Sequence, residues 1–199
     1  MASSRKQKAI ETRERLVKAG EAIFLEQGFQ KTTIAQIIKK AETGYGTAYV
    51  YFKNKDELLI ELMQTMMNFF YQVSELSFEP STKEEAKELI VYQTKEFLSL
   101  AISYKSLMQV IKEAIGYSNA VEDQWTSIRL RFIEGITNDI TYAQTQGLVA
   151  KDINPHYAAK SWFYTNEMFM WEFVCSKEKD DLDVVINTIT DMYINGLYE

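Results

Sequence analysis

The stretch from Thr32 to Lys55 constrains the fold of this chain more than any other part of the sequence. Its first half has apolar residues at positions 34, 35, 37, 38 and 41, which is the spacing of one helical face. Thr33 is followed three residues later by Gln36, a capping-box pattern that starts a helix. Residues 42–44 then predict a break, with Gly44 free to take the backbone angles of a tight turn.

A second short helix is predicted directly after this turn, from Tyr45 to Phe52. Ala48 and Phe52 are four residues apart, so both fall on one side of that helix and can face a core. The tyrosine and threonine hydroxyls of the helix then lie elsewhere around its surface. Two short helices joined by a turn that contains glycine form a helix-turn-helix, whose second helix enters the major groove of DNA.

The amino-acid sequence of this stretch also resembles that of a known family. Residues 32–37 read TTIAQI, residues 46–52 read GTAYVYF, and residues 53–59 read KNKDELL. Joined in this order, the segments are similar to the DNA-binding end of the tetracycline-repressor (TetR) family of bacterial transcriptional regulators, and the resemblance covers roughly Thr12 to Leu62. One departure lies in the turn, where Gly44 stands in place of the family's usual serine cap and Glu42 in place of its usual glycine.

The resemblance implies an all-α fold of about nine helices. It predicts a three-helix helix-turn-helix domain over residues 1–54 and a larger helical domain for effector binding and dimerisation over residues 55–199. It implies a ligand-responsive repressor that a small lipophilic effector releases from a palindromic double-stranded DNA operator. Carried over position by position, the DNA contacts are expected at Thr33, Tyr45, Gly46, Thr47, Tyr49, Tyr51 and Lys55.

The charge of the chain is divided unevenly along its length. The net charge is −6, yet residues 1–55 hold eleven basic and five acidic side chains, and the remainder carries −12. A basic end on an acidic body is typical of a protein that binds nucleic acid. Charge alone leaves open a solvated basic surface, and a second hypothesis is a helical protein that sequesters a ligand or binds a partner through its basic end.

The last two predicted helices, at about 155–175 and 180–197, are unusually apolar. Aromatic and methionine side chains go nearly all round the first of them, so it must be buried on more than one side. Burial by the body on one side and by a second copy on the other satisfies that requirement. In the TetR family these two helices typically pair with their copies, so we expect a homodimer formed through them.

The aromatic body also predicts a pocket for a small molecule, although the same residues can form a plain core. Asn166, Glu167 and Glu172 lie among apolar residues, and a carboxylate beside aromatic rings suits a lipophilic cation. The expected pocket residues are Phe97, Met108, Trp125, Phe132, Trp162, Tyr164, Asn166, Glu167, Met168 and Phe169.

The sequence offers little for catalysis. His156 and Cys175 are the only histidine and cysteine, which leaves no metal-ligand set, and Gly44 and Gly46 do not form a phosphate-binding loop. We therefore expect no enzyme, no cofactor and no metal. Since no apolar run approaches the ~20 residues of a membrane span, we also expect a cytoplasmic protein without a membrane partner.

Overall fold

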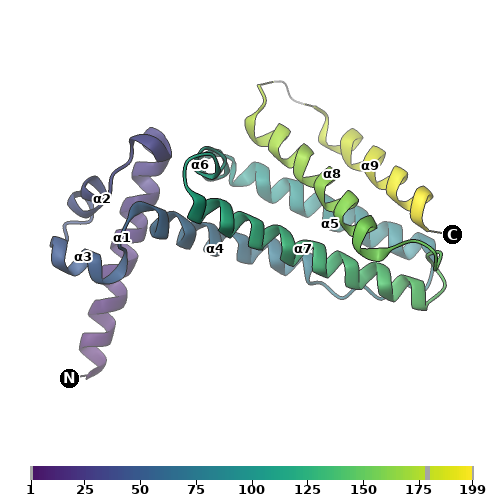
Figure 1. Cartoon of the computed structure of the whole chain (residues 1–199), viewed down its shortest axis with the longest axis horizontal. Coiled ribbons are helices and arrows are strands. Elements are labelled where there is room, and N and C mark those ends of the chain that lie inside the picture. The colour runs from purple at the N-terminus through teal and green to yellow at the C-terminus, as the bar shows by residue number, and fades with distance from the viewer. Residues whose placement is uncertain (1, 178–179, 199) are drawn as a thin grey trace. The chain divides into compact units, whose positions relative to one another are not determined.

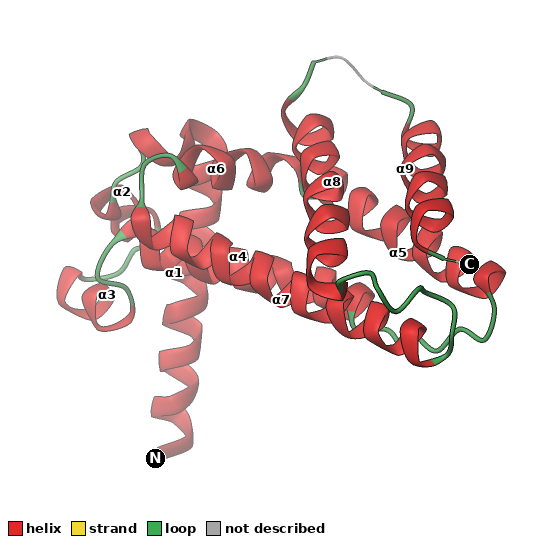
Figure 2. Ribbon diagram, turned by 45° about the vertical axis from the view of Figure 1, so that its right-hand side comes forward, coloured by secondary structure: helices red, strands yellow, loops and turns green. Residues whose placement is uncertain are grey.

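The computed structural model describes residues 2–177 and 180–198, with side chains from residue 6 onward. Within these residues the regular structure is nine helices and one isolated bridge, between Val149 and Tyr198 (Figures 1 and 2). The predicted all-α fold is therefore confirmed. The helices are α1 (Ala2–Lys31), α2 (Ile34–Lys40), α3 (Tyr45–Tyr51), α4 (Lys55–Ser74), α5 (Lys83–Ser103), α6 (Lys105–Ile115), α7 (Asn119–Thr145), α8 (Pro155–Cys175) and α9 (Leu182–Leu197).

The described chain forms two compact units. The head unit comprises the residues up to Met67 together with Ser106–Trp125, and the body unit comprises Asn68–Lys105 together with the residues from Thr126 onward. Helices α4 and α7 therefore contribute residues to both units. The boundary expected after residue 54 separates a DNA-binding domain from an effector-binding domain by their functions, and it stays a prediction.

The first helix, α1, is interrupted at Gly28. This glycine has φ 80° and ψ 176°, a conformation that side chains rarely adopt. The chain then turns, and the buried ring of Phe29 stacks on Phe24 with their centroids 6.0 Å apart. Gly20 is required for a different reason, because a Cβ there would lie 2.2 Å from Cδ2 of Leu58 on α4.

The helix-turn-helix forms with its predicted caps and one difference. Thr33 caps α2, and the full capping box with Gln36 is present. The prediction that Gly44 takes the turn conformation was wrong, because Glu42 has φ 50° whereas Gly44 has an extended φ of −69°. The family's usual glycine position is thus the left-handed one, and here a glutamate occupies it at a cost of roughly 1 kcal/mol.

The body unit is built on α5, which lies against both α8 and α9 (Figures 1 and 2). A chain of aromatic rings runs through its interior. Phe97 lies 5.5 Å from Phe70 and 5.8 Å from Phe132, and Phe132 lies 5.7 Å from Phe163, all between ring centroids. These rings come from four helices, and they form one side of the cavity described below.

Candidate DNA interface and effector cavity

Helix α3 presents a polar, aromatic surface to solvent. Tyr45 is 57% exposed and Tyr49 is 46% exposed, and Thr47 is also exposed. Tyr51 is half-buried. A Cβ added to Gly46 would meet no atom within 4 Å, so the outer side of the helix is open at this point. The structure thus brings five of the predicted DNA contacts together on one short helix.

The opposite side of α3 is anchored in the core of the head unit. Ala48 is 1% exposed and Phe52, the C-terminal cap of the helix, is 3% exposed, as their spacing predicts. Val50 lies between these anchors in sequence and is 79% exposed. Val50 was not among the predicted contacts, although the inward positions of Ala48 and Phe52 already imply that Val50 points outward. An exposed valine can contact a thymine methyl group.

The two predicted phosphate contacts, Thr33 and Lys55, both lie at helix N-termini, and both already have protein partners. The Thr33 hydroxyl accepts a hydrogen bond from the Gln36 N–H at 3.3 Å. The Lys55 ammonium donates to the carbonyl oxygens of Phe29 at 2.6 Å and Thr32 at 2.9 Å, and it lies 4.1 Å from the Phe29 ring centroid. Lys55 therefore stabilises the end of α1, a role that the sequence analysis missed although Gly28 leaves carbonyls there to be capped.

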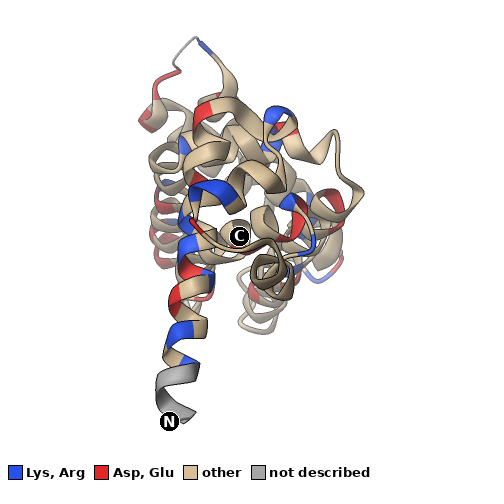
Figure 3. Cartoon of the chain, turned by 90° about the vertical axis from the view of Figure 1, so that its left-hand side faces the viewer, with Lys and Arg blue, Asp and Glu red and all other residues tan. Residues whose placement is uncertain are grey.

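Further basic side chains surround the helix-turn-helix. Lys39 and Lys40 are exposed in the last turn of α2, and Lys53 is exposed just after α3. Along α1, lysine and arginine residues are interspersed with glutamates (Figure 3). Exposed lysine and arginine side chains supply the sequence-independent attraction to phosphates that DNA binding needs.

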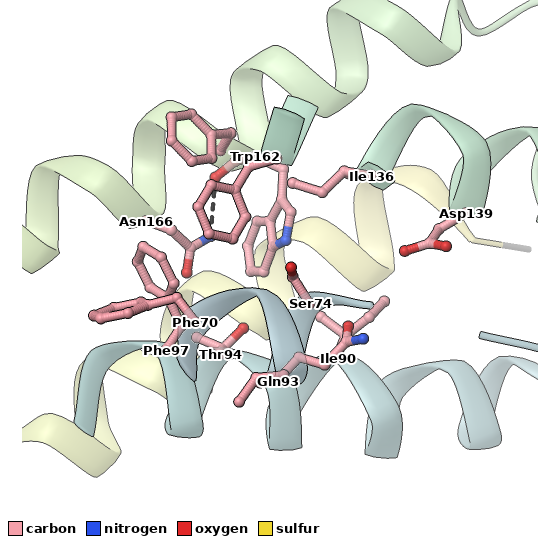
Figure 4. A pocket seen from close by; sticks show the side chains of 13 residues that line it. Phe70, Ser74, Ile90, Gln93, Thr94, Phe97, Ile136, Asp139, Trp162 and Asn166 are labelled. Carbon is pink, nitrogen blue, oxygen red and sulfur yellow. Dashed lines mark hydrogen bonds between the residues drawn. The ribbon is translucent and has the colours of Figure 1, made fainter. Parts of the chain in front are cut away.

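The body unit contains a partly open cavity that is lined mainly by apolar side chains. It measures about 70 Å³ as space open to the centres of water molecules, which is room for a few waters. Helices α4, α5, α7 and α8 all contribute to its wall (Figure 4). The lining residues are Phe70, Val73, Ser74, Ile90, Gln93, Thr94, Phe97, Phe132, Ile136, Asp139, Trp162, Phe163 and Asn166.

Four of the ten predicted pocket residues line this cavity: Phe97, Phe132, Trp162 and Asn166. The other six lie elsewhere. Met108 and Trp125 are buried in the head unit, and Tyr164 is an exposed residue of α8. Glu167 is only 5% exposed, and both of its carboxylate oxygens accept hydrogen bonds from Nε of Arg129, at 2.8 and 3.1 Å.

Met168 and Phe169 line a second, shallower depression between α8 and α9, which we call the outer groove. The groove is wide and mostly apolar, and exposed Met192 lies at its edge. Trp162 borders both the groove and the cavity, and its ring stacks on Tyr193 with centroids 4.2 Å apart. The groove is lined by Ala158, Ser161, Trp162, Thr165, Met168, Phe169, Thr188, Ile189, Met192, Tyr193, Gly196 and Leu197.

The carboxylate that lines the cavity is Asp139, which the sequence analysis did not single out. Burial raises the pKa of Asp139 to about 7. A sequence signal for it exists, because Asp139 follows Phe132 and Ile136 at the i+7 and i+3 positions of one helical face. A carboxylate on an otherwise apolar stripe marks a polar group inside the body.

Other chemistry is sparse. Among the residues with described positions, no three His, Cys, Asp or Glu side chains are grouped so that they could hold a metal ion. His156 and Cys175 are both exposed, on α8. None of the described helices combines the length and apolar character needed to cross a bilayer.

An exposed second helix on a helix-turn-helix, in a chain whose other unit contains an apolar cavity, defines a ligand-responsive DNA-binding regulator. Residues 16–62 match the model of the family described as bacterial regulatory proteins, tetR family. These residues therefore form a TetR-type DNA-binding segment, as the sequence resemblance predicted.

Full-length comparisons agree with this assignment. The chain is 22% identical over 184 residues to the fatty acid metabolism regulator protein of Bacillus subtilis (strain 168), covering 92% of this chain and 94% of the relative. A putative TetR-family regulator from Syntrophomonas wolfei str. Goettingen superposes with a TM-score of 0.74 at 20% identity, covering 92% and 93% of the two chains. The SmeT–triclosan complex superposes with a TM-score of 0.72 at 21% identity, covering 94% and 92%. These solved structures show the same fold.

Proposed function

We propose that this chain is a cytoplasmic repressor that binds a palindromic DNA operator as a homodimer and is released by a small lipophilic effector. The observation that carries the proposal is the outward surface of α3, where exposed tyrosines surround an open glycine on a helix anchored by Ala48 and Phe52. Side chains held in this way on a rigid helix can reach base edges in a major groove.

The proposed DNA contacts divide by chemistry. Tyr45, Gly46 and Thr47 form the end of α3 that approaches the base edges, because a glycine there permits close approach. Tyr49 and Tyr51 contact the groove wall and the phosphates. Thr33 and Lys55 lie at the N-termini of α2 and α4, and helix N-termini favour phosphate binding.

Dimerisation is proposed through the outer groove. Exposed apolar side chains on α8 and α9, among them Met168, Val184 and Met192, are unusual on a solvated surface and suit a second copy of the chain. A twofold pairing presents two α3 helices, and two half-sites one helical turn apart, about 34–36 Å, then make the operator palindromic.

Release is proposed to follow from the size of the cavity. A cavity of about 70 Å³ is smaller than the roughly 300–1,000 Å³ of ordinary ligand pockets. An effector therefore binds an expanded arrangement of α4, α5, α7 and α8 better than the arrangement seen here, and this difference in affinity shifts the population. Two structural elements connect the cavity wall to other parts of the protein. Helices α4 and α7 continue into the head unit, and Trp162 also borders the outer groove. The fold neighbour SmeT has been solved with triclosan, which supports a small lipophilic effector here.

The test is to select duplexes from a randomised DNA pool and to compare binding to the enriched sequence with binding to a scrambled one. Thr47→Ala and Tyr49→Ala should each weaken binding to the selected duplex by about tenfold or more, a loss typical of a base or phosphate contact. Tyr92→Ala, which removes a similarly exposed tyrosine from α5 in the body unit, is the matched control and should have no effect. Equal affinity for every duplex would overturn the proposal and favour a protein that sequesters a ligand or partner through a basic surface.

A further inference from the structure

The cavity has a polar residue at each end and aromatic rings between them. Figure 4 shows Asp139 on α7 at one end and Asn166 on α8 at the other, with the indole of Trp162 between them. Asn166 is already engaged, because its amide nitrogen donates to the Trp162 carbonyl oxygen at 2.9 Å. Asp139 is therefore the lining residue with charge to offer a ligand.

Asp139 has no partner of opposite charge. Across the part of the chain that the structure describes, its carboxylate takes part in no ion pair and accepts no hydrogen bond, and no lysine or arginine lines the cavity. The titratable groups that face Asp139 are the phenols of Tyr193 and Tyr198, whose pKa values its negative charge helps to raise. A carboxylate that is partly removed from water, as Asp139 is, and that lacks a cation is costly unless a ligand supplies one or a proton neutralises it.

We propose that the cavity selects lipophilic organic cations, with Asp139 binding the positive group and the phenylalanine rings enclosing the apolar remainder. The inference rests on the proposed role of the cavity as the effector site and names the chemical class of the effector. Trp162 lines the same space, and an indole face is the best aromatic partner for a cation. Binding of an anionic amphiphile such as a free carboxylate should be disfavoured, because its charge would lie beside Asp139 with no basic side chain to bind it.

Binding of a cation should also release a proton. Burial raises the pKa of Asp139 to about 7, so near neutral pH about half of the molecules carry a protonated Asp139. A cation binds the ionised form and displaces that proton. Its affinity should therefore increase as the pH rises through about 7 and level off above it, while a neutral ligand of the same shape should show no such dependence.

The test uses two probes of nearly identical shape, benzyltrimethylammonium, which is a cation, and neopentylbenzene, which is neutral. Calorimetric titration of the full-length protein at pH 8 should show about tenfold or greater preference for the cation. Asp139→Asn should remove that preference while keeping binding of the neutral probe within about twofold. Glu134→Gln, which neutralises an exposed carboxylate of the same helix, is the matched control and should change neither affinity.

Equal affinity of the wild-type protein for the two probes, or an undiminished preference in Asp139→Asn, would overturn the inference. A second readout needs no variant, because the wild-type affinity for the cation should fall as the pH is lowered from about 8 to about 6, and a flat profile would also overturn it. The DNA selection described above separates this inference from the proposed function. A protein that enriches a duplex but does not prefer the cation loses only the inference, and one that prefers the cation but enriches no duplex loses only the regulatory role.

Discussion

Removing the carboxylate of Glu113 should destabilise the head unit by a measurable amount. Glu113 lies on α6, and its two carboxylate oxygens accept hydrogen bonds from the backbone N–H groups of Phe29 at 2.9 Å and Gln30 at 3.2 Å. These N–H groups follow Gly28, where a positive φ interrupts α1, so the carboxylate ties α6 to the segment before the helix-turn-helix. A Cβ on Gly28 would lie 2.7 Å from Oε2 of Glu113, which shows how closely the two elements approach.

The size of the effect follows from the two bonds. Hydrogen bonds to a charged group contribute about 1.5–3 kcal/mol each, and Glu113 is half-buried, so Glu113→Ala should lower the free energy of unfolding by about 2–4 kcal/mol. Glu113→Gln keeps one acceptor without charge and should lose about 1–2 kcal/mol.

Urea unfolding followed by circular dichroism measures both variants, with Glu14→Ala on the exposed side of α1 as control. A shift in midpoint at constant slope reports stability. If Glu113→Ala unfolded within about 0.5 kcal/mol of the control, the hydrogen bonds would contribute nothing and the reasoning would be refuted.

Three further predictions concern stability. Glu42→Gly should stabilise the protein by up to about 1 kcal/mol in the same unfolding assay, because the left-handed φ of 50° then costs nothing; a loss of stability would contradict the assigned strain. Arg129→Ala should destabilise it by about 3 kcal/mol, since the buried Glu167 carboxylate would lose the Arg129 guanidinium, and Glu167→Gln in the same chain should restore part of that loss. Ionisation of Asp139 disfavours folding, since its pKa is about 7 when folded and 3.8 when unperturbed. Wild-type stability relative to Asp139→Asn should therefore fall as the pH rises from about 4 to about 7 and stay level above that; a constant difference from about pH 4 to about pH 8 would contradict the raised pKa.

The head unit could be predicted well because its signals are local. The capping box at Thr33 and the inward pair Ala48 and Phe52 each depend on residues a few positions apart, and both formed as expected. The exception is informative. We predicted the turn conformation at Gly44 because glycine adopts positive φ angles readily, whereas the residue with a positive φ in the turn is Glu42.

The cavity could be predicted only in part, because it depends on which helices pack together. Phe97 and Trp162 were found as aromatic residues of the body, but periodicity does not say which face of one helix meets which face of another. Asp139 was missed because an isolated carboxylate in sequence looks solvated until the neighbouring helices enclose it. The predicted carboxylate, Glu167, proved to be bound to Arg129 instead.

We propose, as the central claim, that two outward α3 helices in a twofold dimer recognise one DNA site. The most direct measurement is native mass spectrometry of the protein on its enriched duplex, together with the sequence of that duplex. The claim predicts two chains per duplex, and an inverted repeat whose half-sites lie about one helical turn, 34–36 Å, apart or a multiple of it. A single chain on an asymmetric site, or no enriched sequence at all, would contradict it.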